Sequence, residues 1–555
     1  MVGPKPDDDL APPEAASPPQ TLELTLTPSP APGTAAPTRA PTQAHPTAAG
    51  ASGGGMARPF ARAPMWAVAK VVGLDSDDPI TRALALEAAA LPADAQAALR
   101  NASRAGLGDR GVEAGRRADA LAELEQAASM LLRGQRGPAR TLLASAKQTL
   151  ERQRAALAWS IAPALAARMG QVAATAGDRK LAAALLPAAA DGLPAALGRA
   201  ALAAKASLRE GRCLGSSAAA DAAAMVRMAE GPALVVGTVG RGDEAQVGLW
   251  LVDNEARALR QGSFGAAGAD VGLTAITEPG GAWIGGQTRG AHSADGLLLR
   301  IDGRLRPVAQ HDLDLGGDEQ VIAFARSSDG GLWALIEGEV GDPAGPHRGV
   351  WLVAVRPDAT PRTQVLLPLP RPAFAAALRV DSGNGLLLAA GGRGPGEAAG
   401  AFLRAVDAAT VRVQDGEGPA FPGPIFGLQG APRGALAAFG AAGEGKAMRP
   451  YVVRRDLKGR WGKPAKFAAL PAFDHLAVAP AGNATLLLLA AQGTEASPGP
   501  GVVALVAGAR PRVLLSLPGF WPAAALVEGK DAWVAGSARG CGRLGLDAAV
   551  IRLRL

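Results

Sequence analysis

The chain has few of the residues on which catalytic and metal sites depend. Its 555 residues include two Cys, five His and one Tyr, and only 4% are aromatic. One His lies near the N-terminus and the others are far apart, so none has the spacing of metal ligands. Nucleophile-elbow, phosphate-loop and zinc motifs are also missing. We therefore expect no cofactor, no metal and no catalytic residue, which favours a binding or scaffolding protein over an enzyme.

Long apolar runs are missing as well. The best candidate runs without charge, 155–167 and 181–190, are short, Ala-rich and contain Pro163 and Pro187, so we expect no transmembrane segment. The N-terminal sequence MVGPKPDDDLAPPE lacks the apolar core of a signal peptide. The net charge is +7, but the Arg residues of the basic region are scattered and do not form a stripe. Nucleic-acid binding is therefore not expected.

The abundant residues divide the chain into three regions. Residues 1–55 are rich in Pro, Ala and Thr and predict a disordered tail, because such a segment cannot bury enough apolar surface to fold. Residues 56–205 carry Leu and Ala at helical spacing and predict an all-α domain. Within it, a Gly followed by a Leu pair and an Ala occurs after Gly134 and again after Gly177. This pattern resembles tetratricopeptide-like helical hairpins, and a plain helical bundle is the alternative.

Residues 206–555 change to a strand pattern with a long repeat. A triplet of short apolar segments recurs seven times, and its third segment restarts every 46 to 53 residues. The third segments are 248–254, 296–302, 349–355, 400–406, 450–456, 501–507 and 547–555. With a more polar fourth strand, such as 256–264, this period predicts a seven-bladed β-propeller; an irregular β-sandwich is the alternative. The predicted fold class is thus α+β multidomain, with a tail, an all-α segment and an all-β propeller.

The predicted ring needs a strand from elsewhere, because the chain ends on the third strand of the last blade. Residues 206–214 align with the outer strands and precede blade 1, so we expect them to complete blade 7 as a closing strap. Cys213 would then lie beside Cys541, which predicts a disulfide; two buried free thiols are the alternative. A disulfide implies an oxidising compartment. We therefore expect a periplasmic, cell-envelope or secreted protein, with the cytoplasm as the alternative.

Two blades share a polar pattern in addition to their strands. An apolar strand ends in Gly and Ser or Thr, a Gly-rich loop follows, and Asp precedes the next strand. The residues are Gly286, Thr288 and Asp295 within 282–302, and Gly536, Ser537 and Asp547 within 532–553. This pattern resembles a bacterial β-propeller repeat found mostly in extracellular and envelope proteins. The resemblance implies the fold and an envelope setting, and it implies no defined activity.

The candidate binding surface is the face that carries the long loops. Loops between the second and third strands run to about eight to twelve residues, and in a propeller they gather on one face beside the connections between blades. We predict that a protein or glycan partner binds there. The candidate contact residues are Arg241, Asp243, Arg289, His292, His347, Arg348 and Arg393.

Two other functions fit parts of the sequence. An envelope hydrolase or lyase with a polar site at the channel mouth would require His, Asp and Arg side chains to converge on the long-loop face. A polyanion binder would use residues 450–467, where six basic residues are interspersed with Tyr451, Trp461 and Phe467. The same segment fits the outer hairpin of blade 5, whose solvent face should be charged.

Overall fold

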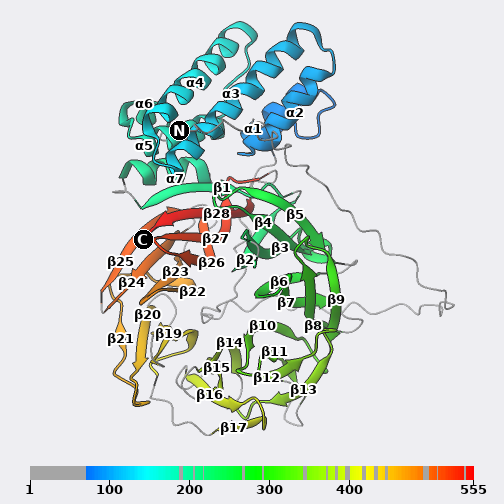
Figure 1. Ribbon diagram of the computed structural model, residues 1–555, viewed down its shortest axis with the longest axis vertical. Helices are drawn as coiled ribbons and strands as arrows, with labels where there is room; N and C mark the ends of the chain where they lie inside the picture. The colour runs from blue at the N-terminus through cyan, green and yellow to red at the C-terminus, as the bar shows by residue number, and fades with distance from the viewer. Residues whose placement is uncertain are drawn as a thin grey trace, which may run out of the picture.

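The computed structural model describes residues 71–555 with short gaps, and it places a helical segment at the rim of a ring of sheets (Figure 1). The gaps are residues 187–191, 204–206, 217, 230, 266–268, 290–292, 342–346, 370–372, 382–384, 394–399, 415–420, 431–434, 444–447, 492–498, 509 and 543–545. The tail predicted for residues 1–55 lies outside the described residues. Within the described residues, every helix is too short or too polar to span a membrane.

The helical segment runs from Pro79 to Ala203, inside the predicted range. Its helices are α1 (Pro79–Ala88), α2 (Pro92–Arg104), α3 (Gly108–Leu132), α4 (Arg136–Leu157), α5 (Pro163–Ala176), α6 (Arg179–Leu185) and α7 (Leu193–Ala203). Pro is the first residue of α1, α2 and α5, where no helical partner exists for its missing N–H. Gly134 and Gly177 follow α3 and α5 with φ of +80° and +82°, which Gly adopts without strain. Consecutive helices therefore turn back and pack through an Ala- and Leu-rich core.

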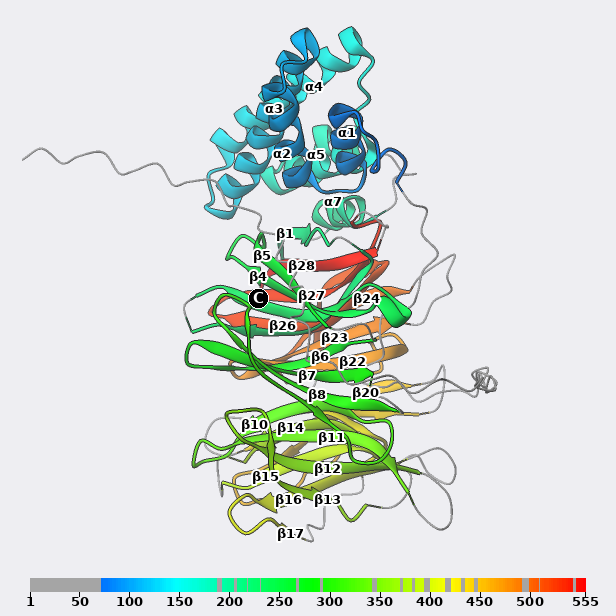
Figure 2. The same cartoon turned by 90° about the vertical axis from the view of Figure 1, so that its right-hand side faces the viewer.

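The remaining chain forms seven four-stranded antiparallel sheets, which confirms the predicted propeller (Figures 1 and 2). Blade 1 is β2 (Ala220–Arg227), β3 (Ala233–Val239), β4 (Gln246–Val252) and β5 (Ala258–Phe264); blade 2 is β6 (Val271–Glu278), β7 (Gly281–Arg289), β8 (Ala294–Asp302) and β9 (Pro307–Leu313). Blade 3 is β10 (Gln320–Arg326), β11 (Leu332–Val340), β12 (His347–Val355) and β13 (Pro361–Leu366); blade 4 is β14 (Ala373–Val380), β15 (Leu387–Arg393), β16 (Ala401–Asp407) and β17 (Arg412–Gln414). Blade 5 is β18 (Ile425–Gly430), β19 (Leu436–Ala442), β20 (Arg449–Arg455) and β21 (Ala465–Lys466); blade 6 is β22 (Phe473–Ala481), β23 (Ala484–Ala491), β24 (Pro500–Val506) and β25 (Pro511–Pro518). Blade 7 is β26 (Phe520–Glu528), β27 (Asp531–Arg539), β28 (Leu546–Arg554) and the early strand β1 (Leu208–Cys213).

Strand burial explains the sequence pattern. The second and third strands of a blade lie between two neighbouring sheets, so both of their faces are buried, as β3 and β4 illustrate. The outer strand β13 instead alternates between half-buried and exposed residues. Trp283, Trp333 and Trp533 share one slot on second strands and are 2–5% exposed. They therefore belong to the core.

Three outer hairpins close with the same Asp turn. Asp253, Asp302 and Asp456 each accept backbone N–H groups from the residues two and four positions later. Each also pairs with an Arg four residues along the chain. This local turn brings the polar fourth strand back beside the third strand in blades 1, 2 and 5.

The ring closes as the sequence predicted. Strand β1 pairs antiparallel with β28, with Leu208 opposite Leu553 and Cys213 opposite Ala549. Cys213 and Cys541 form a disulfide, with their Cα atoms 5.6 Å apart. The early strand therefore supplies the outer edge of blade 7 and covers the backbone groups that β28 would otherwise expose.

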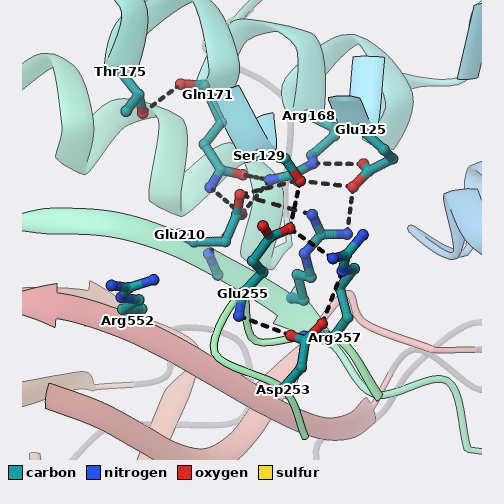
Figure 3. Close-up of polar contacts among 12 residues, drawn as sticks. Glu125, Ser129, Arg168, Gln171, Thr175, Glu210, Asp253, Glu255, Arg257 and Arg552 are labelled. Atoms are coloured by element: carbon teal, nitrogen blue, oxygen red, sulfur yellow. Dashed lines mark hydrogen bonds and ion pairs between the residues drawn. The ribbon is translucent and has the colours of Figure 1, made fainter. Parts of the chain in front are cut away.

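A buried ionic network attaches the helical segment to the strap (Figure 3). Arg168 of α5 pairs with Glu125 of α3 at 3.1 Å and with Glu210 of β1, and Arg212 of β1 also pairs with Glu125. All four side chains are 3–14% exposed. Burial alone would raise the pKa of Glu125, but the charges of Arg168 and Arg212 outweigh it and hold this pKa at about 2. Glu125 is thus ionised at neutral pH, and the network ties α3 and α5 to blade 7.

Two more contacts hold the helices at the rim. In the hairpin between β4 and β5, Glu255 accepts a hydrogen bond from the Ser129 hydroxyl and pairs with Arg133 at 3.4 Å (Figure 3). In the loop after Cys541, the Gly542 N–H donates to the Ala89 carbonyl at 3.1 Å. The helical segment therefore contacts blades 7 and 1, and it lies beyond the rim of the ring (Figures 1 and 2).

Candidate functional site

The described candidate residues all lie where second strands end and third strands begin. Arg241 and Asp243 occupy the loop between β3 and β4, Arg289 ends β7, and His347 and Arg348 begin β12. Arg393 is the last residue of β15, and its side chain lies outside the described part of the structure. His292 also lies outside the described residues. The described candidate residues therefore belong to the same face of the ring, which we call the long-loop face.

The structure brings these residues together in pairs. Arg289 of blade 2 forms an ion pair with Asp243 of blade 1, and the two side chains are 58% and 81% exposed. Arg348 of blade 3 donates to the Asp318 carbonyl at 3.3 Å and lies 3.8 Å from a carboxylate oxygen of Glu337. The Arg289–Asp243 pair therefore joins blades 1 and 2, whereas Arg348 pairs with Glu337 inside blade 3 and contacts the connection from blade 2 through the Asp318 carbonyl.

An open hollow of about 410 Å³ lies beside Arg348, at the boundary of blades 2 and 3. It is formed by the β7–β8 loop, the connection from β9 to β10, and the end of β11. The lining residues are Ser293, Asp314, Gly316, Gly317, Asp318 and Glu339. Because three of these six residues are acidic and the rest are small or hydroxylated, the hollow is polar and negatively charged.

Three carboxylates meet at the edge of this hollow. One oxygen from each of Asp295, Asp314 and Glu319 lies within 4.8 Å of one oxygen from both of the others. Glu319 is fully buried, whereas Asp295 is half-buried and Asp314 is exposed. We call these three residues the acidic cluster. Oxygen-only donor sets of this kind suit hard cations such as Ca²⁺ or Mg²⁺.

Electrostatics at Glu319 are unusual for a carboxyl group. Burial raises its pKa to about 7, the N–H groups of Gly317 and Leu315 lower it, and the charges of Asp314 and Asp295 raise it further. The ordinary pKa of a Glu side chain is 4.5. The increase caused by burial and by the neighbouring negative charges is therefore larger than the decrease caused by the two backbone hydrogen bonds.

Sequence reasoning missed the acidic cluster. The connection between blades 2 and 3 reads HDLDLGGDEQ (311–320), a run of four acids around two Gly residues. Asp295 was noted only as part of the repeat pattern. The acidic run and its Gly pair were the available signal, but their proximity to Asp295 depends on how β8 and β10 lie side by side in the ring.

The basic segment of blade 5 forms an outer hairpin, as one of the two interpretations predicted. Strands β20 and β21 flank the turn at Asp456, and the basic residues of the turn are exposed. Tyr451 and Phe467 are 0% and 1% exposed, and the Tyr451 hydroxyl donates to the Gly423 carbonyl at 2.6 Å. Trp461 packs edge-on against Phe421. Two of the three aromatic residues are thus in the core, where no nucleic-acid base can stack on them.

Comparison with known proteins gives no family for this chain. No family model and no curated protein matches it. Among solved structures, polysaccharide lyase Uly1 is 11% identical, with a TM-score of 0.41 over 60% of this chain and 89% of that chain. Sqt1 from Chaetomium thermophilum is 14% identical, with a TM-score of 0.35 over 59% and 82%. Drosophila Plexin A in complex with Semaphorin 1b is 9% identical, with a TM-score of 0.34 over 62% and 88%. Likenesses of this extent carry no inference about what the chain binds or catalyses.

Proposed function

We propose that this chain is a non-catalytic binding or scaffolding protein whose long-loop face receives a protein or glycan partner. The polar hollow between blades 2 and 3 is the observation that carries the proposal. It is open to solvent, and the paired charges of Arg348 and Glu337 lie at its side. Such a surface offers fixed hydrogen-bonding groups to a polar ligand.

The arrangement of charge supports binding over hydrolysis or lyase chemistry. The alternative requires His, Asp and Arg to converge within hydrogen-bonding distance. Arg289 instead pairs with an acid of blade 1, and Arg348 pairs with an acid of its own blade 3. Across the described residues, no ion pair joins the acidic cluster to an Arg or His. A polyanion-binding role for blade 5 is less well supported, because Tyr451 and Phe467 are buried.

The disulfide bears on where the protein acts. Cys213 and Cys541 are joined, and such bonds persist in oxidising compartments. We propose a periplasmic, cell-envelope or secreted location.

The binding test uses the full chain immobilised on a surface and presented with a glycan array and with an envelope-protein extract. Arg289→Ala and Arg348→Ala alter the long-loop face, and Arg460→Ala is the matched control because it is an exposed Arg on the outer hairpin of blade 5. We expect the two face variants to weaken the binding of any captured partner at least about tenfold, as truncation of interface Arg residues often does. The control should bind as the wild type does.

Two results would contradict this proposal. Release of shortened products from a bound glycan, abolished by a long-loop variant, would indicate the hydrolase or lyase. Binding that depends on Arg460 and falls steeply with salt would indicate a polyanion site on blade 5.

A further inference from the structure

Each carboxylate of the acidic cluster accepts hydrogen bonds from its own loop. Asp314 Oδ1 accepts from the Gly316 N–H at 2.8 Å, Glu319 Oε1 accepts from the Gly317 N–H at 2.9 Å, and Asp295 Oδ1 accepts from the Ser293 hydroxyl at 3.1 Å. Within the described residues, no further hydrogen bond is made by the second oxygen of each group. The side chains are thus positioned by the fold while one oxygen of each stays available.

Glu319 is the fully buried member of the acidic cluster, so an oxygen without a hydrogen-bond donor is most unfavourable there. It is 0% exposed, and its Oε2 has no hydrogen-bond donor among the described residues. Its backbone N–H donates to the Ala294 carbonyl at 2.6 Å, which holds it against the start of β8. A buried ionised carboxylate without a partner is strongly unfavourable, and two more carboxylates within 4.8 Å add repulsion. A cation in the cluster would remove both penalties.

Blade 7 contains an internal comparison. Asp547 is the second residue of β28, as Asp295 is of β8, and each lies opposite the residue before the closing Arg of the preceding strand. The Asp547 carboxylate accepts the N–H groups of Gly215 and Ser216 at 2.8 and 3.1 Å, together with the Ser216 hydroxyl. Beside Asp295 the neighbouring connection instead supplies the carboxylates of Asp314 and Glu319, and among the described residues none of its N–H groups donates to Asp295. The same strand position therefore has an internal hydrogen-bond cap in blade 7 and a group of three carboxylates in blade 2.

We propose that Asp295, Asp314 and Glu319 bind one Ca²⁺ ion between blades 2 and 3. Ca²⁺ binds oxygen ligands at about 2.3–2.6 Å, so ligands on opposite sides of one ion lie about 4.6–5.2 Å apart. The three oxygens lie within 4.8 Å of one another, so all three can reach one ion of this size. Mg²⁺ demands near-ideal octahedral geometry, whereas Ca²⁺ accepts the irregular arrangement that three loop and strand carboxylates provide. The open hollow leaves room for water or a ligand oxygen to complete the coordination. The ion joins β8 to the connection that leads into β10 and so fixes the long-loop face.

The cation site is tested by calorimetric titration of the chelator-treated full chain with Ca²⁺, without any partner present. We expect one ion per chain, with a dissociation constant on the order of 0.1 mM, as in extracellular calcium modules. Glu319→Gln and Asp314→Asn should each weaken binding at least about tenfold. Glu244→Gln is the matched control, because Glu244 is an exposed acid on the same face but lies one blade away.

A melting experiment separates loss of the ion from loss of the fold. Ca²⁺ should raise the Tm of the wild type and of Glu244→Gln, and should leave the Tm of Glu319→Gln unchanged. In chelator, Glu319→Gln should melt no lower than the wild type, because it removes a crowded buried charge. Asp314→Asn changes an exposed side chain and provides a second folded variant. Absence of saturable binding up to about 10 mM Ca²⁺, or equal binding by the variants, would overturn the proposal. Either result leaves the binding role of the long-loop face to be judged separately.

Discussion

At the scale of single residues, the helical core contains an ion pair that solvent does not reach. Arg117 of α3 donates to both carboxylate oxygens of Glu87 in α1, at 2.7 and 2.6 Å, and both side chains are 0% exposed. Arg117 also donates to the Ser160 carbonyl at 2.9 Å. Burial raises the pKa of Glu87, and Arg117 opposes that rise. Each of these two buried charges is therefore stabilised by the other.

Removing one partner of this pair should be much more harmful than removing both. Glu87→Leu leaves Arg117 buried without its carboxylate, and we expect the free energy of unfolding to fall by about 3–5 kcal/mol. The double variant Glu87→Leu/Arg117→Met should recover most of that loss, because two apolar side chains replace two paired charges. Urea denaturation of the wild type and the two variants measures the difference. A double variant as unstable as the single one would show that the pair contributes more than mutual neutralisation.

At the scale of elements, one six-residue strand connects the two folded parts of the chain. Strand β1 pairs with β28 on one edge, while its Glu210 and Arg212 join the ionic network with α3 and α5. Its last residue, Cys213, carries the disulfide. The strap is therefore the structural link between ring closure and attachment of the helices.

The junction should weaken in acid. The pKa of Glu125 is about 2 in the folded protein and 4.5 ordinarily, so its stabilising contribution is complete above about pH 4.5 and is lost as the pH falls towards 2. Glu125→Gln should be less stable than the wild type at pH 7, and the difference in unfolding free energy should shrink between pH 4.5 and 2. Glu151→Gln, an exposed acid on α4, is the control and should show no such convergence. A constant difference across this range would contradict the assigned pKa.

At the scale of the whole molecule, the ring is closed between residues far apart in sequence. The disulfide spans 328 residues, and the strand pairing of β1 with β28 runs beside it. Because a propeller blade is stabilised by its two neighbours, opening one blade would expose apolar surface on both sides. Closure therefore affects the entire ring.

Loss of the disulfide should lower stability without changing the fold. The chain-entropy relation gives an upper bound of about 5–6 kcal/mol for a loop of this length. We expect the wild type to unfold at lower urea concentration after reduction, and the Cys213→Ser/Cys541→Ser variant to behave like the reduced protein in either condition. Non-reducing mass spectrometry identifies the linked peptides. Identical unfolding with and without reductant would show that the strand pairing alone closes the ring.

Much of the fold could be predicted because its signals are local and repeated. Turns and apolar strands alternate in a unit that recurs about every fifty residues, so every blade has the same sequence pattern. Buried Trp residues recur at one position of that pattern. The strap followed from the missing outer strand of the last blade, and the position of Cys213 then identified its partner. The turns at Asp253 and Asp302 also depend only on local sequence, because each Asp accepts the N–H group of a residue two positions later.

The acidic cluster could not be predicted in the same way. Asp295 begins a strand of blade 2, whereas Glu319 precedes the first strand of blade 3, and their approach depends on how two sheets pack. Burial of Glu319 and the absence of a cap at Asp295 are properties of that packing. The sequence alone determined the order of elements, the number of blades and the means of closure, because these follow from periodicity along the chain. Only the tertiary structure decided which charges meet, because electrostatic environment depends on neighbours in space.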